Sequence, residues 1–162
     1  MARLRDGITA TDPALIAATW FGCGLLPKAP GTWGSLAALP FAWVLRVEWG
    51  FWGLAIATLL VSLVGWWAAE VYARKTGIAD PGEVVIDEVA GQWLTLLPVP
   101  ADPIYYLGGF LLFRLFDIKK PWVIGWADRN VHGGLGIMLD DLFAGAFGAV
   151  VLIVALWGVP TP

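Results

Sequence analysis

No charged side chain interrupts residues 51–69, which read FWGLAIATLLVSLVGWWAA. These nineteen residues would be long enough, as a helix, to cross the hydrocarbon core of a bilayer. The stretch ends near Trp66 and Trp67, whose rings favour the membrane interface, and charges resume with Glu70 and Arg74. This segment therefore predicts a transmembrane helix, and it sets the class of fold.

The composition agrees with a membrane protein. The 162 residues are 59% hydrophobic and 14% charged, against about 25% charged in soluble domains. This length predicts a single domain over residues 1–162. A net charge of −3 without a basic stripe argues against nucleic acid as a partner. The single cysteine, Cys23, and the single histidine, His132, argue against an intramolecular disulfide and a zinc site.

Other helices are indicated on both sides of this segment. Asp12 and Pro13 match the N-cap and first position of a short helix that ends near residues 21–24. A turn at residues 48–50 separates the 51–69 segment from the apolar run before it. Further helices are predicted at residues 35–47, 81–97, 103–117 and 143–157. We expect an all-α, compact bundle of about six to seven helices, membrane-embedded through several transmembrane or membrane-inserted helices.

The distribution of basic residues predicts an orientation. With the N-terminus in the cytoplasm, the chain would cross out and back twice and then out once more, over residues 36–47, 51–69, 89–98, 104–116 and 142–157. Nine of the ten basic residues, all but Arg46, then face the cytoplasm, as the positive-inside rule prefers. Glu48 and Asp102 join Arg46 on the far side. We therefore expect the polar residues to meet at the inner leaflet.

Most charges gather in four short blocks, at residues 27–32, 80–88, 114–120 and 128–141. The first block lies in a loop rich in proline and glycine. Lys28 and the hydroxyls of Thr32 and Ser35, with backbone N–H groups at a helix start, would suit a phosphate group. Helix capping explains the two hydroxyls equally well.

The second block contains two adjacent acids that capping does not explain. Asp80 and Glu83 match the N-cap and N3 positions of a capping box for the helix at 81–97. Asp87 and Glu88 would lie a full turn inside that helix, and no basic residue lies three or four positions away. We therefore expect Asp87 and Glu88 to serve metal or phosphate chemistry.

The third block pairs an arginine with an acid. Arg114 and Asp117 lie three residues apart on one predicted helix face, which predicts an intrahelical ion pair or a guanidinium that binds phosphate. Lys119 and Lys120 would either contact anionic lipid headgroups or anchor the helix at the interface.

The fourth block places Asp140 and Asp141 after a glycine-rich turn, at the start of the last helix. The helix dipole alone would accommodate acids there. However, Asp141 precedes Gly145 by four residues, just as Asp87 precedes Gly91. Small residues let two helices approach closely, so Asp87 and Asp141 can face each other across a divalent cation.

These side chains favour one kind of chemistry. Carboxylate oxygens without a cysteine or histidine cluster select magnesium over zinc. Magnesium beside an arginine and lysines indicates hydrolysis or transfer of a phosphoryl group.

The same four blocks resemble the phosphatidylglycerophosphatase A family. The resemblance runs in order over residues 20 to 158, through the motifs Pro30-Gly31-Thr32, Asp87-Glu88 with Gly91, Arg114 with Phe116-Asp117 and Lys120-Pro121, and Gly133-Gly134-Leu135-Gly136 through Asp140-Asp141. It implies an all-α, magnesium-dependent enzyme of the bacterial inner membrane, with its active site facing the cytoplasm. Such an enzyme removes the terminal phosphate of phosphatidylglycerophosphate to give phosphatidylglycerol.

With this resemblance in view, roles can be assigned as a hypothesis. Asp87, Glu88, Asp140 and Asp141 would bind Mg²⁺ and position the attacking water, and Asp80 would be a further ligand or mainly a cap. Arg114, Lys28 and Lys120 would neutralise the phosphate, assisted by Thr32 and Ser35. Direct attack by water is favoured, and a covalent intermediate on Asp117 or Asp141 stays open.

Two other interpretations have distinct signatures. A phospho-alcohol transferase also uses magnesium and aspartates, but the Asp-Gly-x-x-Ala-Arg motif of that class is absent. A non-catalytic membrane scaffold would tolerate single neutral replacements of Asp87, Glu88 or Asp141, whereas an enzyme would not.

Overall fold

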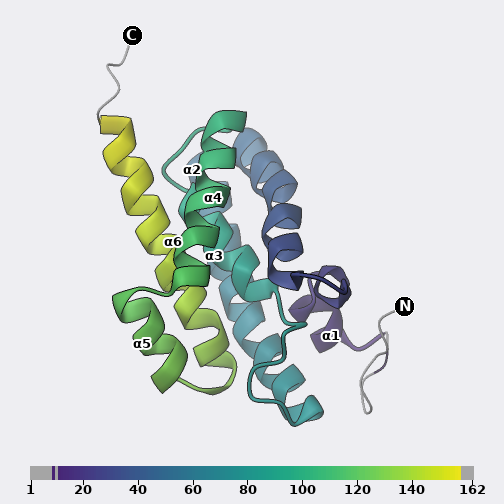
Figure 1. The fold of residues 1–162 in the computed structure, drawn as a ribbon. Coiled ribbons are helices and arrows are strands. Elements are labelled where there is room, and N and C mark those ends of the chain that lie inside the picture. The colour runs from purple at the N-terminus through teal and green to yellow at the C-terminus, as the bar shows by residue number, and fades with distance from the viewer. Residues whose placement is uncertain (1–8, 10, 158–162) are drawn as a thin grey trace.

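The computed structural model describes residue 9 and residues 11–157, and regular structure in that part of the chain is entirely helical (Figure 1). The helices are α1 (Pro13–Ala18), α2 (Pro30–Thr76), α3 (Ile86–Leu96), α4 (Pro103–Lys119), α5 (Trp122–Asn130) and α6 (Gly133–Trp157), with a short 3₁₀ helix at Cys23–Leu25. The predicted all-α bundle is confirmed.

Helix α2 is a hairpin of two limbs. Gly50 interrupts the helical backbone with φ 65° and ψ −154°, a conformation that side chains other than glycine rarely adopt. The chain reverses direction there, between residues 30–49 and residues 51–76 (Figure 1). The predicted turn at residues 48–50 is confirmed.

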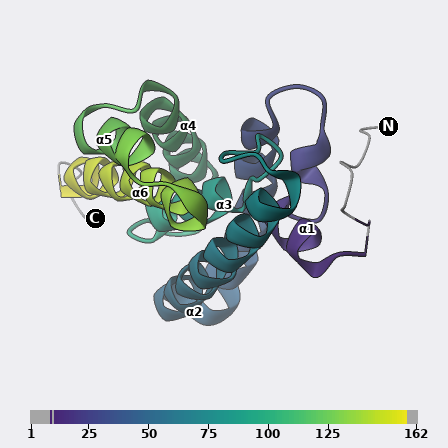
Figure 2. The ribbon, with the colours of Figure 1, turned by 90° about the horizontal axis from the view of Figure 1, so that it is seen from below.

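Helix α3 lies in the middle of the bundle. It packs against α2, α4 and α6, and the view from below shows it between them (Figure 2). The closest approach is to α6 at Gly91 and Gly145: a Cβ atom on Gly91 would lie 2.5 Å from the backbone oxygen of Asp141, and one on Gly145 would collide with the carbonyl of Gly91. The predicted crossing at these two glycines is confirmed.

Two helix starts differ from the sequence-based prediction. The prediction of a capping box at Asp80 is wrong, because α3 begins only at Ile86. Residues 80–85 form a turn instead, and the N–H group of Val85 donates a hydrogen bond to Ala18 O at 2.8 Å. Asp87 and Glu88 therefore lie in the first turn of α3 and not a turn inside it.

The opposite error occurs at the last helix. Helix α6 begins at Gly133, ten residues before the predicted position, so Asp140 and Asp141 are well inside it. The glycines before these two acids are helical and pack closely against the second limb of α2. A Cβ atom on Gly134 would lie 2.5 Å from Trp66 O, and Glu70 Oε2 accepts a hydrogen bond from Gly134 N at 2.7 Å. A dipole at the helix start thus cannot explain Asp140 and Asp141.

The outer surface of the bundle is apolar. Ile56, Leu59 and Leu63 on the second limb of α2 are each more than half exposed. Helices α2 and α6 are long and apolar enough to cross a membrane by length and composition. The fold is thus consistent with a membrane-associated bundle.

Candidate active site

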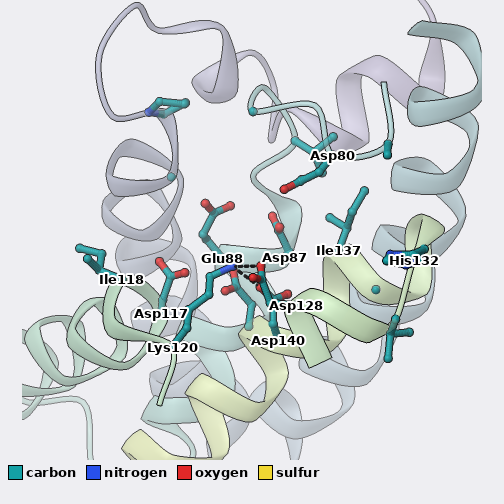
Figure 3. Close-up of a pocket in the computed structure, with 18 of the residues that line it drawn as sticks. Asp80, Asp87, Glu88, Asp117, Ile118, Lys120, Asp128, His132, Ile137 and Asp140 are labelled. Carbon is teal, nitrogen blue, oxygen red and sulfur yellow. Dashed lines mark hydrogen bonds and ion pairs between the residues drawn. The ribbon is translucent and has the colours of Figure 1, made fainter. Parts of the chain in front are cut away.

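A cavity of about 430 Å³ opens where the four polar blocks meet (Figure 3). Its walls come from the start of α2, the turn before α3 with the first turn of α3, the end of α4, and the α5–α6 region. The titratable residues that line it are Asp80, Asp87, Glu88, Arg114, Asp117, Lys120, Asp128, His132, Asp140 and Asp141. The prediction that the blocks assemble on one side of the molecule is confirmed.

Three carboxylates form the floor of this cavity. One ligand atom from each of Asp87, Glu88 and Asp141 lies within 4.8 Å of the other two. The acids come from two helices, α3 and α6, and they meet because Gly91 and Gly145 permit the close crossing. Asp141 is only 3% exposed.

The donor set fits a hard divalent cation. Asp87 Oδ1 and Glu88 Oε2 are buried and accept no hydrogen bond. Buried carboxylate oxygens without a donor are costly, and a cation would satisfy them. Magnesium binds through one or two carboxylates together with water and substrate phosphate, which three clustered acids can accommodate.

Burial makes these acids hard to ionise. It raises the pKa of the Asp87 carboxyl well above its ordinary value, and the adjacent charge of Glu88 raises it further. Burial also raises the pKa of Glu88 to about 7. A cation between the two carboxyl groups would favour their charged forms.

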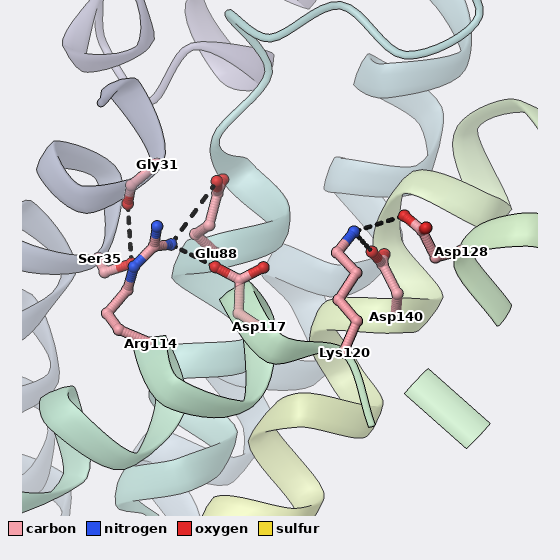
Figure 4. Close-up of polar contacts among 8 residues, drawn as sticks. All are labelled: Gly31, Ser35, Glu88, Arg114, Asp117, Lys120, Asp128 and Asp140. Atoms are coloured by element: carbon pink, nitrogen blue, oxygen red, sulfur yellow. Dashed lines mark hydrogen bonds and ion pairs between the residues drawn. The ribbon is translucent and has the colours of Figure 1, made fainter. Parts of the chain in front are cut away.

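Arg114 stands next to this acid cluster, held by Asp117. Arg114 Nη1 lies 2.5 Å from Asp117 Oδ2 and 4.0 Å from Glu88 Oε1 (Figure 4). Arg114 Nε is buried and donates no hydrogen bond. Gly31 makes the arrangement possible, since a Cβ there would collide with Glu88 Oε1 and lie 3.2 Å from Arg114 Nη1.

Lys120 forms the second cationic position. Its Nζ lies 2.5 Å from Asp128 Oδ1 and 2.6 Å from Asp140 Oδ2 (Figure 4). Burial by itself would lower the pKa of the ammonium, but the hydrogen bonds to Asp128 and Asp140 outweigh it and raise the pKa above its ordinary value. Lys120 thus points into the cavity and not toward lipid.

The structure separates the other predicted residues into two groups. Asp80 lines the cavity, although it is outside the three-acid cluster. Lys28, Thr32 and Ser35 do not line it. Lys28 is exposed, and the fully buried Ser35 hydroxyl donates to Gly31 O at 2.8 Å.

Two residues that the sequence analysis did not assign to the site also line the cavity. Asp128 pairs with Lys120, and the exposed His132 lies near the start of α6 (Figure 3). Both belong to the fourth polar block, so membership of that block was the available signal.

The charges of the cavity define its chemistry. Seven carboxylates line it beside two permanent cations, Arg114 and Lys120. An acidic cluster next to a guanidinium and an ammonium group is typical of enzymes that act on phosphate esters with a divalent cation. The fold and the site together define a helical enzyme that acts on phosphate esters.

The chain belongs to the phosphatidylglycerophosphatase A family: residues 16–156 match the family described as "Phosphatidylglycerophosphatase A". It is 41% identical over 150 residues to phosphatidylglycerophosphatase A of Escherichia coli (strain K12), which covers 91% of this chain and 86% of the relative. The same enzyme of Haemophilus influenzae is 36% identical over 146 residues, or 90% of each chain. The chain is therefore a phosphoric monoester hydrolase.

A third relative carries a different name. A Bacteroides thetaiotaomicron protein, provisionally named a phosphatidylinositol-3-phosphatase, is 39% identical over 158 residues, or 90% of this chain and 94% of the relative. No solved structure matches the chain.

Proposed function

We propose that the protein hydrolyses phosphatidylglycerophosphate to phosphatidylglycerol and phosphate, with Mg²⁺ as cofactor, in bacterial phospholipid synthesis. The family membership supports the lipid substrate. The excess of seven carboxylates over two cations in the cavity supports the metal. A phosphate dianion would be repelled from such a cavity unless a divalent cation neutralised the acids first.

Asp87, Glu88 and Asp141 would hold the ion, and Asp140 and Asp80, which also line the cavity, are further candidates. A bound magnesium ion would neutralise the developing charge on the phosphate and lower the pKa of a water molecule to generate the nucleophile.

The two cations of the cavity would bind the phosphate oxygens. Asp117 holds Arg114 Nη1, and this ion pair fixes the guanidinium at the wall of the cavity, where it would bind the substrate phosphate. Lys120 reaches the cavity from the opposite side and would approach a second oxygen. Two cations on two sides orient the phosphorus for in-line attack.

Direct attack by water is the mechanism we favour. Asp117 is engaged with Arg114 at 2.5 Å, and Asp141 belongs to the cluster that would hold the ion. Both carboxylates therefore already have a role in the proposed site, which favours water as the nucleophile. In hydrolysis the water oxygen bonds to phosphorus, the bond from phosphorus to the glycerol oxygen breaks, and that oxygen takes up a proton.

We further propose that the second limb of α2 crosses the inner membrane, with the cavity on the cytoplasmic side, where the positive-inside rule places nine of the ten basic residues. Exposed tryptophans lie toward both ends of the α2 hairpin, with Trp49 and Trp52 beside the Gly50 turn and Trp66 and Trp67 on the second limb. At about 1.5 Å per residue, Trp52 and Trp66 are separated by roughly 21 Å along the limb. Two aromatic bands at such a spacing are typical of a helix that meets both interfaces of a bilayer.

The test is phosphate release from defined lipids in detergent, first with Mg²⁺ and then with EDTA. We expect magnesium-dependent release from phosphatidylglycerophosphate, with much less from phosphatidic acid or phosphatidylinositol 3-phosphate. Asp87→Asn should abolish release, whereas Glu48→Gln, a change at an exposed residue beside the Gly50 turn, should not. Faster release from phosphatidylinositol 3-phosphate would overturn the assigned substrate, and full activity in EDTA would overturn the metal.

A further inference from the structure

A second polar pair lies away from the cavity, near the Gly50 turn of the α2 hairpin. Arg46 is on the first limb of α2, and Tyr106 is in the first half of α4. Figure 1 shows the hairpin turn and the start of α4 at the upper end of the bundle, and α5 and the start of α6 at the lower end. The pair is therefore remote from the residues that line the cavity.

Aromatic packing places the two side chains near each other. The Trp43 and Tyr106 rings lie 5.1 Å apart, edge to face. Arg46 follows Trp43 by three residues and so shares its helix face. The guanidinium charge acts on the Tyr106 phenol, and Arg46 Cζ lies 5.9 Å from the centre of the Phe51 ring across the turn.

Each side chain carries a buried polar atom without a hydrogen-bond partner, although Arg46 as a whole is only half-buried. Tyr106 is only 4% exposed, and neither its hydroxyl nor Arg46 Nη1 makes a hydrogen bond with the described residues. Arg46 forms no ion pair with that part of the chain. Asp102, an acid close by in sequence to Tyr106, instead caps α4 by accepting from Ile104 N at 2.8 Å.

The missing partner must be an acceptor. Arginine can only donate, and the phenol can donate as well. The Phe51 ring interacts with the guanidinium as a whole cation, so the N–H groups still need an acceptor. An oxyanion satisfies both donors and neutralises the arginine, and phosphate oxygens match the guanidinium fork.

The surroundings indicate where that phosphate comes from. Trp49 and Trp52, beside the hairpin turn, are 64% and 71% exposed, and exposed tryptophans favour the depth of lipid headgroups. We propose that Arg46 and Tyr106 form a binding site for the phosphate group of a phospholipid, at the end of the bundle away from the active site.

The experiment is native mass spectrometry of the full chain in a detergent without phosphate, titrated with phosphatidylglycerol. Arg46→Gln should weaken the binding of one lipid by about tenfold, the equivalent of a charge-assisted hydrogen bond, and Tyr106→Phe by about threefold. Arg74→Gln, at an exposed arginine paired with Glu70, is the matched control and should leave binding unchanged. Diacylglycerol, which has the same acyl chains without phosphate, should bind equally to the wild type and to Arg46→Gln.

Two further arms isolate the site. Phosphatidylglycerol can also enter the active site as product, so the effect of Arg46→Gln should persist in a Lys120→Met background. Arg46→Gln should keep its phosphatase activity, and this activity would show that the variant folds. If Arg46→Gln does not fold, Arg46→Lys replaces it, because lysine keeps the charge but lacks the guanidinium fork. Unchanged lipid binding by a folded Arg46 variant would overturn the proposal. Displacement of the lipid by millimolar inorganic phosphate would assign the site to free phosphate and overturn the lipid as ligand.

Discussion

Replacing Glu88 with glutamine should stabilise the metal-free protein at alkaline pH while abolishing its activity. Burial raises the pKa of Glu88 from 4.5 to about 7, so holding this side chain ionised at pH 8 costs the folded state about 3 kcal/mol. Glutamine keeps the shape and removes the charge, but it loses the attraction of Arg114, whose Nη1 lies 4.0 Å away. We therefore expect a gain of about 1–3 kcal/mol in the free energy of unfolding.

The size of this effect depends on pH. A carboxyl group with a raised pKa in the folded state binds its proton more tightly than in the unfolded chain, so its destabilising contribution is absent below pH 4.5, grows up to about pH 7 and is complete above. The free energy of unfolding of Glu88→Gln should thus equal that of the wild type at pH 4.5 and exceed it at pH 8.

Thermal unfolding in detergent micelles with EDTA measures this difference, at about 2–4 °C for each kcal/mol in a chain of this size. Glu48→Gln, at an exposed residue, is the control and should not change the unfolding temperature at either pH. A Glu88→Gln protein that is no more stable than the wild type at pH 8, or that is equally stabilised at both pH values, would show that the buried charge of Glu88 does not destabilise the folded protein.

Three other predictions concern the helix crossing, the second cation and the metal. Gly91→Ala should destabilise the protein by about 1–3 kcal/mol and reduce activity, because the new methyl group would lie 2.5 Å from Asp141 O. Gly108→Ala on α4, where a methyl group would have nothing within 4 Å, should be neutral or stabilising. Equal unfolding temperatures for the two variants would contradict this prediction. Lys120→Met should lower kcat/KM for the lipid by about 10²-fold, because a hydrogen-bond donor to the phosphate is lost. The same change at the exposed neighbour Lys119 should leave kcat/KM unchanged. Equal losses of kcat/KM in the two variants would show that Lys120 does not act in the site. The affinity for Mg²⁺, measured by calorimetry, should rise with pH through about 7, because Glu88, together with Asp87 and its raised pKa, must lose its proton to bind the ion. An affinity that does not change over this range would contradict Glu88 as a ligand.

The assembly of the active site was predictable from the sequence because charge is scarce in this chain. A polar block inside an apolar bundle has few places to lie, and residues of all four blocks line one cavity, although Lys28 of the first block does not. The shared spacing of Asp87 to Gly91 and Asp141 to Gly145 also predicted the crossing of α3 and α6, since the steric demand of a close approach is local to those glycines.

Helix boundaries and side-chain directions depend on tertiary contacts that no local pattern reveals. The residues around Asp80 have the composition of a capping box, but the hydrogen bond from Val85 N to Ala18 O holds them in a turn. The glycines before Asp140 would suit a turn, but packing against Trp66 makes them helical. Lys120 ends α4 with a φ of 44°, and its side chain enters the cavity to meet Asp128 and Asp140.

The central claim is that Asp87, Glu88 and Asp141 bind the divalent cation that the reaction requires. Electron paramagnetic resonance of Mn²⁺, used in place of Mg²⁺, tests it directly on the purified protein. We expect bound Mn²⁺ that Mg²⁺ displaces, and a loss of affinity of about tenfold or more in Asp87→Asn and Asp141→Asn but not in Glu48→Gln. Wild-type Mn²⁺ affinity in both aspartate variants would exclude Asp87 and Asp141 as ligands of the cation.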